Sequence, residues 1–317
     1  MLSRVADALY WMGRYLERAE NVARLLLVTE DFATETQALD EDLAQTAWKD
    51  LRAIFPGAQL TRAVPASAPQ AVPYLAGLFL DPQNPYSIHS SLRKARENAR
   101  AVREALTVEV FVALNETFRE LEAYDRRGLP DLPGFRDALS ATHKGLFGVM
   151  GAAELTLTRD EGWHFLRLGE ALERAYRTAL VLRAKLPALL APGPRTDVPL
   201  YDTQWRCLLR SLSSLENYRR AAGARMEPTL VVPFLLFDPH SPRSLRHGTA
   251  AVKACLDRIS GADELSSPAR LVGKFHADLC YQDDALGSRG DLTGFLDRVL
   301  GELARAHDAL TAQYFAT

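Results

Sequence analysis

The longest helical pattern in this chain is SRVADALYWMGRYLERAENVARLLLVTEDFA, residues 3–33. Its apolar side chains recur at steps of three and four residues, at Val5, Leu9, Met12, Leu16, Ala19, Ala23 and Leu26. That spacing places them on one face of an α-helix, which has about 3.6 residues per turn. Alanine, leucine, arginine and glutamate dominate the segment, and all four favour helix. The stretch therefore predicts a long amphipathic helix.

Comparable patterns cover most of the remaining chain. They run through 41–54, 88–106, 108–126, 133–152, 157–187, 201–223, 242–260, 264–282 and 291–315. Ser87 and Ser244 stand where an N-cap would open a helix. Two short apolar runs, Tyr74–Leu80 and Leu230–Phe237, are interpreted as buried connectors or single helical turns. Because sustained alternation of apolar and polar residues is absent, we expect an all-α fold.

The chain also repeats itself. The motif Gly-x-x-Leu-Glu-Arg-Ala begins at Gly13 and again at Gly169, an offset of 156 residues. Four further matches follow in the same order at offsets of 157 to 160 residues: Thr46-x-Trp48 with Thr203-x-Trp205, Asp81-Pro82 with Asp238-Pro239, Phe118 and Tyr124 with Phe275 and Tyr281, and Asp131-Leu132 with Asp291-Leu292. Such ordered matches predict a tandem duplication. We expect two helical bundles, residues 1–152 and 153–317, packed with pseudo-twofold symmetry into one compact unit.

Composition and charge exclude several classes of protein. The 317 residues are 47% hydrophobic and carry 38 Lys and Arg against 40 Asp and Glu, a formal net charge of -2. This balance lacks the basic field of a nucleic-acid binder. Charges at Arg4, Asp7 and Arg14 interrupt the N-terminal segment, and the longest apolar run is far shorter than the roughly 20 residues of a membrane span. With three widely spaced cysteines and no disulfide framework, we expect a cytoplasmic protein.

Charged side chains gather on two of the predicted helices. Each residue of an ideal helix advances about 100°, so most charges of the first helix share an arc of about 120° opposite its apolar face. The helix 88–106 has a similar arc opposite Ala95 and Ala99. The members are Arg14, Glu17, Arg18, Asn21 and Arg24 on the first helix and Arg93, Arg96, Glu97, Arg100, Arg103 and Glu104 on the second.

Two interpretations of these faces stay open. They could be solvated surfaces laced with i, i+4 pairs, namely Arg93–Glu97, Arg100–Glu104 and Glu20–Arg24. Alternatively, the two helices pack side by side with these faces inward, so that Glu17 and Glu97 lie between arginines. The second repeat favours a particular role for the first, because Arg96-Glu97-Asn98-Ala99-Arg100 becomes Lys253-Ala254-Cys255-Leu256-Asp257 there.

Other patterns lack the partners that a site would need. His276 and Cys280 could form the edge of a metal site, with Asp283-Asp284 beyond, but no cluster of metal-binding residues completes it. The glycine-rich phosphate-binding, dinucleotide-binding and nucleophile-elbow motifs are absent from the sequence. We therefore expect no metal and no cofactor. Trp48 and Trp205, which occupy equivalent positions in the two repeats, are interpreted as core residues.

The sequence resembles the bacterial alpha-E domain family over essentially its whole length. The likeness is carried by Leu2-Ser3-Arg4-Val5-Ala6, Leu9-Tyr10-Trp11, Gly13-Arg14-Tyr15, Glu17-Arg18-Ala19-Glu20-Asn21, Asn84-Pro85, Ala95-Arg96-Glu97-Asn98-Ala99-Arg100 and Pro242-Arg243-Ser244. Its polar motif positions match Arg14, Glu17, Arg18, Glu20, Asn21, Arg24, Arg96, Glu97, Asn98, Arg100, Arg103 and Glu104, which form the candidate binding cluster. The family supplies no established catalytic residue.

The resemblance implies an all-helical protein encoded beside, or fused to, a circularly permuted ATP-grasp protein. It further implies an accessory subunit of a peptide-modification or amide-ligation system, which binds the ATP-grasp ligase or its peptide substrate. The absence of a nucleophile and base in one motif agrees with a non-catalytic role. The alternative is an enzyme with a site between helices, in which Glu17 or Glu97 acts as general acid or base and arginines hold an anionic substrate during acyl or phosphoryl transfer.

Overall fold

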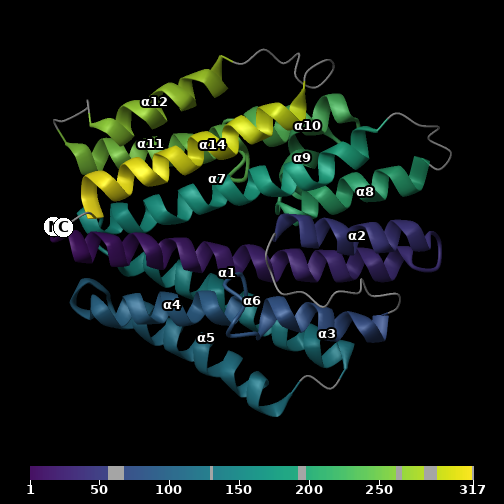
Figure 1. Ribbon diagram of the computed structural model, residues 1–317, viewed down its shortest axis with the longest axis horizontal. Coiled ribbons are helices and arrows are strands. Elements are labelled where there is room, and N and C mark those ends of the chain that lie inside the picture. Colours follow the sequence, from purple (N-terminus) through teal and green to yellow (C-terminus); the bar gives the residue numbers. More distant parts are fainter. Residues whose placement is uncertain (56–67, 129–130, 192–197, 262–265, 282–290, 316–317) are drawn as a thin grey trace. The chain divides into compact units, whose positions relative to one another are not determined.

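The computed structural model describes residues 1–55, 68–128, 131–191, 198–261, 266–281 and 291–315 (Figure 1). All regular structure within these ranges is helical. The prediction of an all-α fold is therefore confirmed. The chain divides into two compact units, Met1–Glu170 and Ala171–Thr317, and the division falls inside one helix, α7 (Glu161–Leu190).

The first unit is built around its N-terminal helix. Its elements are α1 (Ser3–Thr36), α2 (Glu41–Ile54), α3 (Ala68–Phe79), α4 (Ile88–Ala101), the short 3₁₀ helix η1 (Arg103–Ala105), α5 (Val108–Arg127), α6 (Leu132–Thr156) and the first part of α7. Helices α2, α3, α4 and α6 all contact α1, and α5 packs on α4 and α6. In Figure 1, α2 lies on one side of α1 and α4 on the other.

The second unit begins within α7 and continues through six further helices in its described part. These are α8 (Val198–Ser211), α9 (Leu215–Ala222), α10 (Pro228–Phe237), α11 (Leu245–Ser260), α12 (Ser267–Cys280) and α14 (Leu292–Leu310), which η2 (Thr311–Phe315) extends. Helix α11 packs on α10 and α12, and α12 packs on α14. Cys207, Cys255 and Cys280 are all free thiols.

Helix starts follow the chemistry that the sequence predicts. The hydroxyl of Ser87 accepts a hydrogen bond from the backbone N–H of Ser90 at 3.0 Å, and Ser244 accepts one from His247 at the same distance. Both serines are therefore N-caps, as predicted. The local likeness agrees with the proposed duplication, which as a relation between whole repeats stays a prediction.

Four expectations about helix extent were wrong. The helix expected over 88–106 ends at Ala101, and Arg103 and Glu104 lie in the separate 3₁₀ helix η1. The apolar runs interpreted as connectors or single turns belong to the full helices α3 and α10. Each tolerates an internal proline, Pro73 and Pro233 respectively. The single helix expected over 201–223 is instead two helices, because the chain turns at Ser213, whose φ of 49° ends α8.

Both tryptophans that the sequence assigned to the core are buried. Trp48 is 4% exposed and Trp205 is 0% exposed. The ring of Trp48 meets that of Tyr74 edge to face at 5.9 Å, and the Tyr74 hydroxyl donates a 3.1 Å hydrogen bond to the Trp48 carbonyl. Trp205 makes a similar edge contact with Tyr201 at 6.0 Å. The prediction is confirmed for both residues.

No helix in the described part of the chain combines the length and the apolar character that crossing a membrane requires.

Candidate functional site

The candidate cluster is carried by two neighbouring helices of the first unit. Helix α1 carries one half of it, namely Arg14, Glu17, Arg18, Glu20, Asn21 and Arg24. The other half lies on α4 and η1, namely Arg96, Glu97, Asn98, Arg100, Arg103 and Glu104. Helices α1 and α4 pack against each other, as expected. The two halves of the cluster nevertheless have opposite environments.

The α1 half is buried. Glu17 and Glu20 are both 0% exposed, Asn21, Arg24 and Arg14 are nearly as buried, and Arg18 is half-buried. The solvated-face interpretation is therefore wrong for α1. The reason is that other helices cover α1 on its polar side as well as on its apolar side. We call this set of α1 residues the buried polar stripe.

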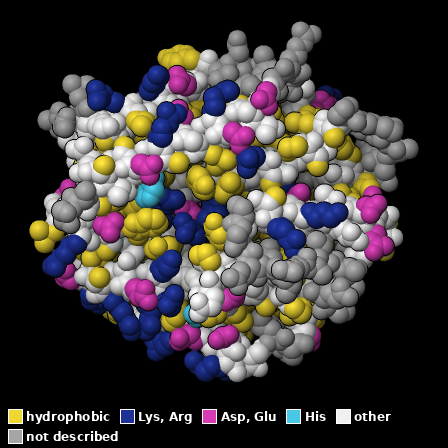
Figure 2. All heavy atoms as spheres, in the orientation of Figure 1, with side chains coloured by type: hydrophobic (Ala, Val, Ile, Leu, Met, Phe, Trp, Pro, Cys, Tyr) yellow, Lys and Arg dark blue, Asp and Glu magenta, His cyan; other side chains and the backbone are white. Residues whose placement is uncertain are grey.

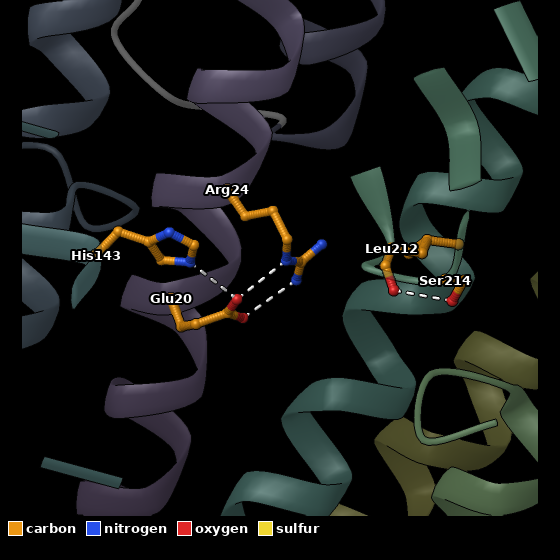
Figure 3. A network of polar contacts seen from close by, with 5 residues as sticks. All are labelled: Glu20, Arg24, His143, Leu212 and Ser214. Atoms are coloured by element: carbon orange, nitrogen blue, oxygen red, sulfur yellow. Dashed lines mark hydrogen bonds and ion pairs between the residues drawn. The ribbon is translucent and has the colours of Figure 1, made fainter. Parts of the chain in front are cut away.

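Glu20 is the centre of a defined network in this stripe (Figure 3). Its carboxylate accepts two hydrogen bonds from Arg24, at 3.0 Å from Nε and 3.1 Å from an Nη atom. His143 of α6 contacts the same carboxylate, with Nε2 at 3.2 Å from Oε1. The i, i+4 pair predicted between Glu20 and Arg24 is thus present, but in the interior rather than on a solvated face. Such a buried pair is stable only while both partners remain.

Aromatic rings contact two further cations of α1, Arg14 and Arg18. Arg14 donates a 2.9 Å hydrogen bond to the hydroxyl of Tyr10, and its guanidinium lies 5.4 Å from the ring centre of Trp11. Arg18 lies 5.3 Å from the ring centre of Tyr15, and Lys94 of α4 lies 5.4 Å from the same ring. These are cation–π distances. The tyrosines and tryptophan of the opening motif therefore position its charges as well as filling space.

Asn21 has the least expected environment in the stripe. Its side chain is buried, and neither Oδ1 nor Nδ2 has a hydrogen-bond partner among the described residues. Leaving a buried polar group unpaired costs about 1–3 kcal/mol. Packing alone would therefore favour an apolar residue at this position.

The polar face of α4 points to solvent instead. Arg93, Glu97 and Arg100 are exposed, and Arg96 and Asn98 are half-buried. The expectation that Glu97 packs inward between arginines, beside Glu17, is therefore wrong. Helix α4 contacts its neighbours through an apolar face instead, which consists of Ile88, Leu92, Ala95 and Ala99.

The charged face of α4 also lacks ion pairs with the described residues. Among the described residues, Arg93, Arg96 and Arg100 form no ion pair, so the predicted pairs Arg93–Glu97 and Arg100–Glu104 are absent. In η1, the guanidinium of Arg103 lies 4.5 Å from the ring centre of Phe111 and donates to the Leu106 carbonyl at 3.0 Å. This half of the cluster therefore presents both arginines and glutamates to solvent.

Glu30 was missed by the sequence reasoning. It is buried in α1 and pairs with Arg136 of α6, which also bonds Asp31 at 2.6 Å. It lines a cavity of about 310 Å³ together with Trp48. The signal was available, because Glu30 continues the apolar stripe four residues after Leu26. A carboxylate on an apolar stripe indicates a buried charge.

The α7 helix has a similar internal pair. Glu173 is 0% exposed, and its Oε1 accepts a 2.8 Å hydrogen bond from Nε of Arg177, which is also buried. The spacing is i, i+4, as it is for Glu20 and Arg24. Each of the two Glu-Arg dipeptides of the sequence, Glu17-Arg18 and Glu173-Arg174, thus has a fully buried glutamate.

The weaker metal hypothesis concerned α12. His276 contacts Thr249 through Nδ1 at 3.0 Å and the sulfur of Cys280 through Nε2 at 3.4 Å. Burial lowers the pKa of His276, and the positive charges of Arg246 and Lys253 lower it further. The described residues contain no group of three or more His, Cys, Asp or Glu that could hold a metal ion. Asp283 and Asp284 lie outside the described residues.

Comparisons with known proteins show which family this chain belongs to. The uncharacterized protein Mb2597 of Mycobacterium bovis is 28% identical over 337 residues, covering 99% of this chain and 37% of that protein. The uncharacterized proteins MT2643 and Rv2567 of Mycobacterium tuberculosis show the same identity and coverage. The chain therefore spans little more than a third of the length of these curated relatives. No solved structure matches it.

A family model supplies the assignment. Residues 1–315 match the model described as "a predicted alpha-helical domain with a conserved ER motif". The dipeptide Glu-Arg occurs twice in the sequence, and its first copy, Glu17-Arg18, lies in the buried polar stripe of α1. Since the match covers nearly the whole chain and the fold is helical throughout its described part, the chain belongs to the Alpha-E family.

Proposed function

We propose that this chain is a non-catalytic binding subunit of an ATP-grasp-linked system that modifies peptides or joins amide bonds. Its resemblance to proteins encoded beside ATP-grasp ligases suggests the setting. The main observation in favour of a non-catalytic role is that the motif residues of α1 and those of α4 have opposite environments. The carboxylates of the α1 motif, Glu17 and Glu20, are sealed in the interior, whereas the arginines of α4 face solvent.

Burial argues against an acid or base role for the α1 glutamates. A general acid or base must approach the reacting atom to about 2.6–3.2 Å. Glu17 and Glu20 expose no surface to a substrate, and Glu20 already accepts hydrogen bonds from Arg24 and contacts His143. The remaining motif carboxylates, Glu97 and Glu104, are exposed. The buried polar stripe therefore serves the integrity of the fold, and recognition falls to the surface.

Helix α4 is the part of the motif that a partner can reach. Arginine is enriched in protein interfaces because its planar guanidinium binds carboxylates through two parallel hydrogen bonds. Arg93 and Arg100 are exposed and have no ion-pair partner among the described residues. The length of the relatives agrees with a modular role, since the matched region forms only 37% of them. We place the system in the cytoplasm, where the three free thiols would stay reduced.

Binding to the partner tests the proposal directly. The purified chain is titrated into the ATP-grasp protein encoded beside it, and binding is followed by calorimetry and by co-elution. We expect a complex of micromolar or tighter affinity, and a loss of about tenfold or more when Arg93 and Arg100 are both changed to Glu. Arg258→Glu on α11 is the matched control, because Arg258 is also an exposed helical arginine.

Two results would contradict the proposal. One is the lack of any complex at partner concentrations of about 100 μM, a range in which specific subunits normally associate. The other is turnover of an ATP-grasp substrate by the isolated chain that Glu17→Gln abolishes while the fold persists.

A further inference from the structure

Three arginines from two helices converge on one surface of the first unit. Arg96 and Arg100 come from α4, and Arg119 comes from α5, which packs beside α4. Arg100 and Arg119 are exposed, and Arg96 is half-buried. We call these three residues the arginine face. Lys and Arg side chains gather at the lower left of Figure 2, in the region of α4 and α5, with acidic side chains among them.

Asn115 of α5 holds two of these arginines. Its Nδ2 donates to the Phe111 carbonyl at 2.8 Å, which leaves Oδ1 free to accept a 2.6 Å hydrogen bond from Nε of Arg96. Nε of Arg119 lies 3.3 Å from the Asn115 carbonyl. The ring of Phe118 lies 4.9 Å from the Arg96 guanidinium. Arg96 is thus held through Nε and through its contact with the Phe118 ring, and no described residue accepts a hydrogen bond from its terminal Nη groups.

The charges of the arginine face are close enough to repel one another. Burial lowers the pKa of Arg96, the charge of Arg100 lowers it further, Glu122 raises it, and Arg119 lowers it again. None of the three arginines forms an ion pair with a described residue. Like charges at i, i+4 on a helix are destabilising by a few tenths of a kcal/mol. A bound anion would relieve this repulsion.

The spacing of the arginines indicates what kind of anion would fit them. Arg96 and Arg100 are one helical turn apart, about 6 Å along the axis of α4 at 1.5 Å per residue. Alternate residues of an extended peptide are about 6.6 Å apart and point to the same side. Carboxylates at alternate positions of an extended peptide therefore match the two α4 arginines, and Arg119 lies beside them on α5.

We propose that the arginine face binds an extended acidic peptide segment, with its carboxylates paired to Arg96, Arg100 and Arg119. The identity of that segment as part of the ligase or its substrate rests on the proposed function. A nucleic acid fits less well, because the chain has a net charge of -2 and the exposed Glu97 lies next to Arg96. Bidentate pairing with carboxylates is the interaction that the free Nη groups of Arg96 support.

The test uses the full chain and a labelled peptide without any partner protein. The probe is a fluorescein-labelled peptide with glutamate at alternate positions and serine between them, and binding is followed by fluorescence anisotropy at low and high salt. We expect saturable binding that weakens with salt. Arg100→Glu and Arg119→Glu should each weaken it about tenfold, and the same peptide with glutamine should bind about tenfold more weakly.

Two variants separate position from charge. Asn115→Ala retains all three charges but releases Arg96, so it should weaken binding by about threefold, less than either charge reversal. Arg258→Glu makes the same charge change on α11 and should leave affinity within about twofold. Circular dichroism melting confirms that each variant is folded.

Several outcomes would contradict the proposal that the arginine face binds an acidic peptide. These are wild-type affinity in both Arg100→Glu and Arg119→Glu, equal binding of the glutamine peptide, and no binding at about 1 mM peptide. Tighter binding of an oligothymidylate of equal charge would assign the surface to nucleic acid.

The two proposals can fail independently of each other. A chain that binds the peptide but not the ATP-grasp protein contradicts only the proposed function. A wild-type chain that binds the ATP-grasp protein, but whose Arg100→Glu and Arg119→Glu variants keep full affinity for the peptide, contradicts the arginine face alone.

Discussion

Gly169 lies directly against the backbone of Tyr10, so closely that a Cβ at Gly169 would overlap the Tyr10 carbonyl oxygen. Gly13 lies in the same way against the carbonyl of Leu166. Tyr10 and Leu166, like Gly13 and Gly169, are 156 residues apart in sequence. Gly13 and Gly169 are thus equivalent positions, and so are the residues that they contact, Leu166 and Tyr10. This reciprocal pattern is what a twofold axis between the two helices produces. Within the first unit, this crossing of α1 and α7 supports the proposed duplication.

The crossing makes glycine substitution a sharp test. Gly13→Ala and Gly169→Ala should each destabilise the protein by about 1–3 kcal/mol or more, because backbone rather than a flexible side chain blocks the new methyl group. Urea unfolding measures the change. Helix propensity alone predicts the opposite sign, a gain of about 1 kcal/mol.

Gly148 in α6 provides the matched control. It also lies inside a helix, but nothing lies within 4 Å of a Cβ added there. Gly148→Ala should therefore stabilise by about 0.5–1 kcal/mol. Equal effects of all three substitutions would show that the helices do not cross closely at these glycines.

Replacing each buried tryptophan with alanine should create a cavity and lower the free energy of unfolding, by different amounts for the two residues. Trp205→Ala should cost about 3–5 kcal/mol, as is usual for a fully buried tryptophan. Trp48→Ala should lie at the lower end of that range, because Trp48 already lines a cavity of about 310 Å³. Thermal and urea unfolding measure both. A loss well under 1 kcal/mol for Trp48→Ala would instead indicate a residue that serves binding at the surface.

The environment of α1 shows what sequence periodicity can and cannot predict. The steps of three and four residues from Val5 to Leu26 correctly predicted a helix and its apolar face. They assigned the opposite face to solvent or to α4, because the pattern of one helix does not reveal how many neighbours it has. Helices α2, α3, α4 and α6 contact α1, and α7 also crosses it, so Glu17 and Glu20 are buried on the face that the pattern marks as polar.

The α4 half of the cluster shows a second limit of sequence-based prediction, which concerns contacts between helices. Sequence identified Arg96, Glu97 and Arg100 as one face, and the structure keeps them on one face. It could not show that Asn115 and Phe118 hold Arg96, since those residues come from another helix and carry no motif of their own. Contacts of this kind depend on how α4 and α5 pack, which no local pattern encodes.

The pair of Glu20 and Arg24 should behave as a buried ion pair. Glu20→Gln should destabilise by about 3–5 kcal/mol, because it removes the charged carboxylate that accepts two hydrogen bonds from the buried Arg24. Replacing both residues with methionine should cost less than the sum of the two single losses, since the two charges of the pair are removed together. Urea unfolding of the two single variants and the double variant measures the coupling, and simple additivity would contradict it.

The fold should lose stability in mild acid through two half-buried histidines. Burial is the main cause that lowers the pKa of both His89 and His276 below the ordinary value of about 6.5. Between the folded and unfolded pKa values the unfolded chain binds more protons, so stability is full above about pH 6.5 and falls as pH drops through the folded pKa values. His276→Gln should therefore show a smaller loss of stability between pH 7 and pH 5 than the wild type. Urea unfolding at the two pH values tests this, and identical losses would exclude a contribution from His276.

Glu17 offers the clearest separation between a structural and a functional role for the motif. Its side chain is completely buried on a helix that several others contact, so its carboxylate must be compensated in the folded state. Glu17→Ala should therefore destabilise the fold by about 3–5 kcal/mol, the usual cost of removing one partner from a buried charged group.

Glu97→Ala is the matched control, because Glu97 belongs to the same motif but is exposed on α4 and has no ion pair among the described residues. Its effect on stability should lie within about 0.5 kcal/mol, as at ordinary surface positions. Urea unfolding and partner binding are measured on both variants. If Glu17→Ala instead abolishes binding while stability is nearly unchanged, the buried polar stripe is itself a binding site. Because that result would move recognition from the surface of α4 into the interior of the bundle, it would also contradict the division of roles on which the proposed function rests.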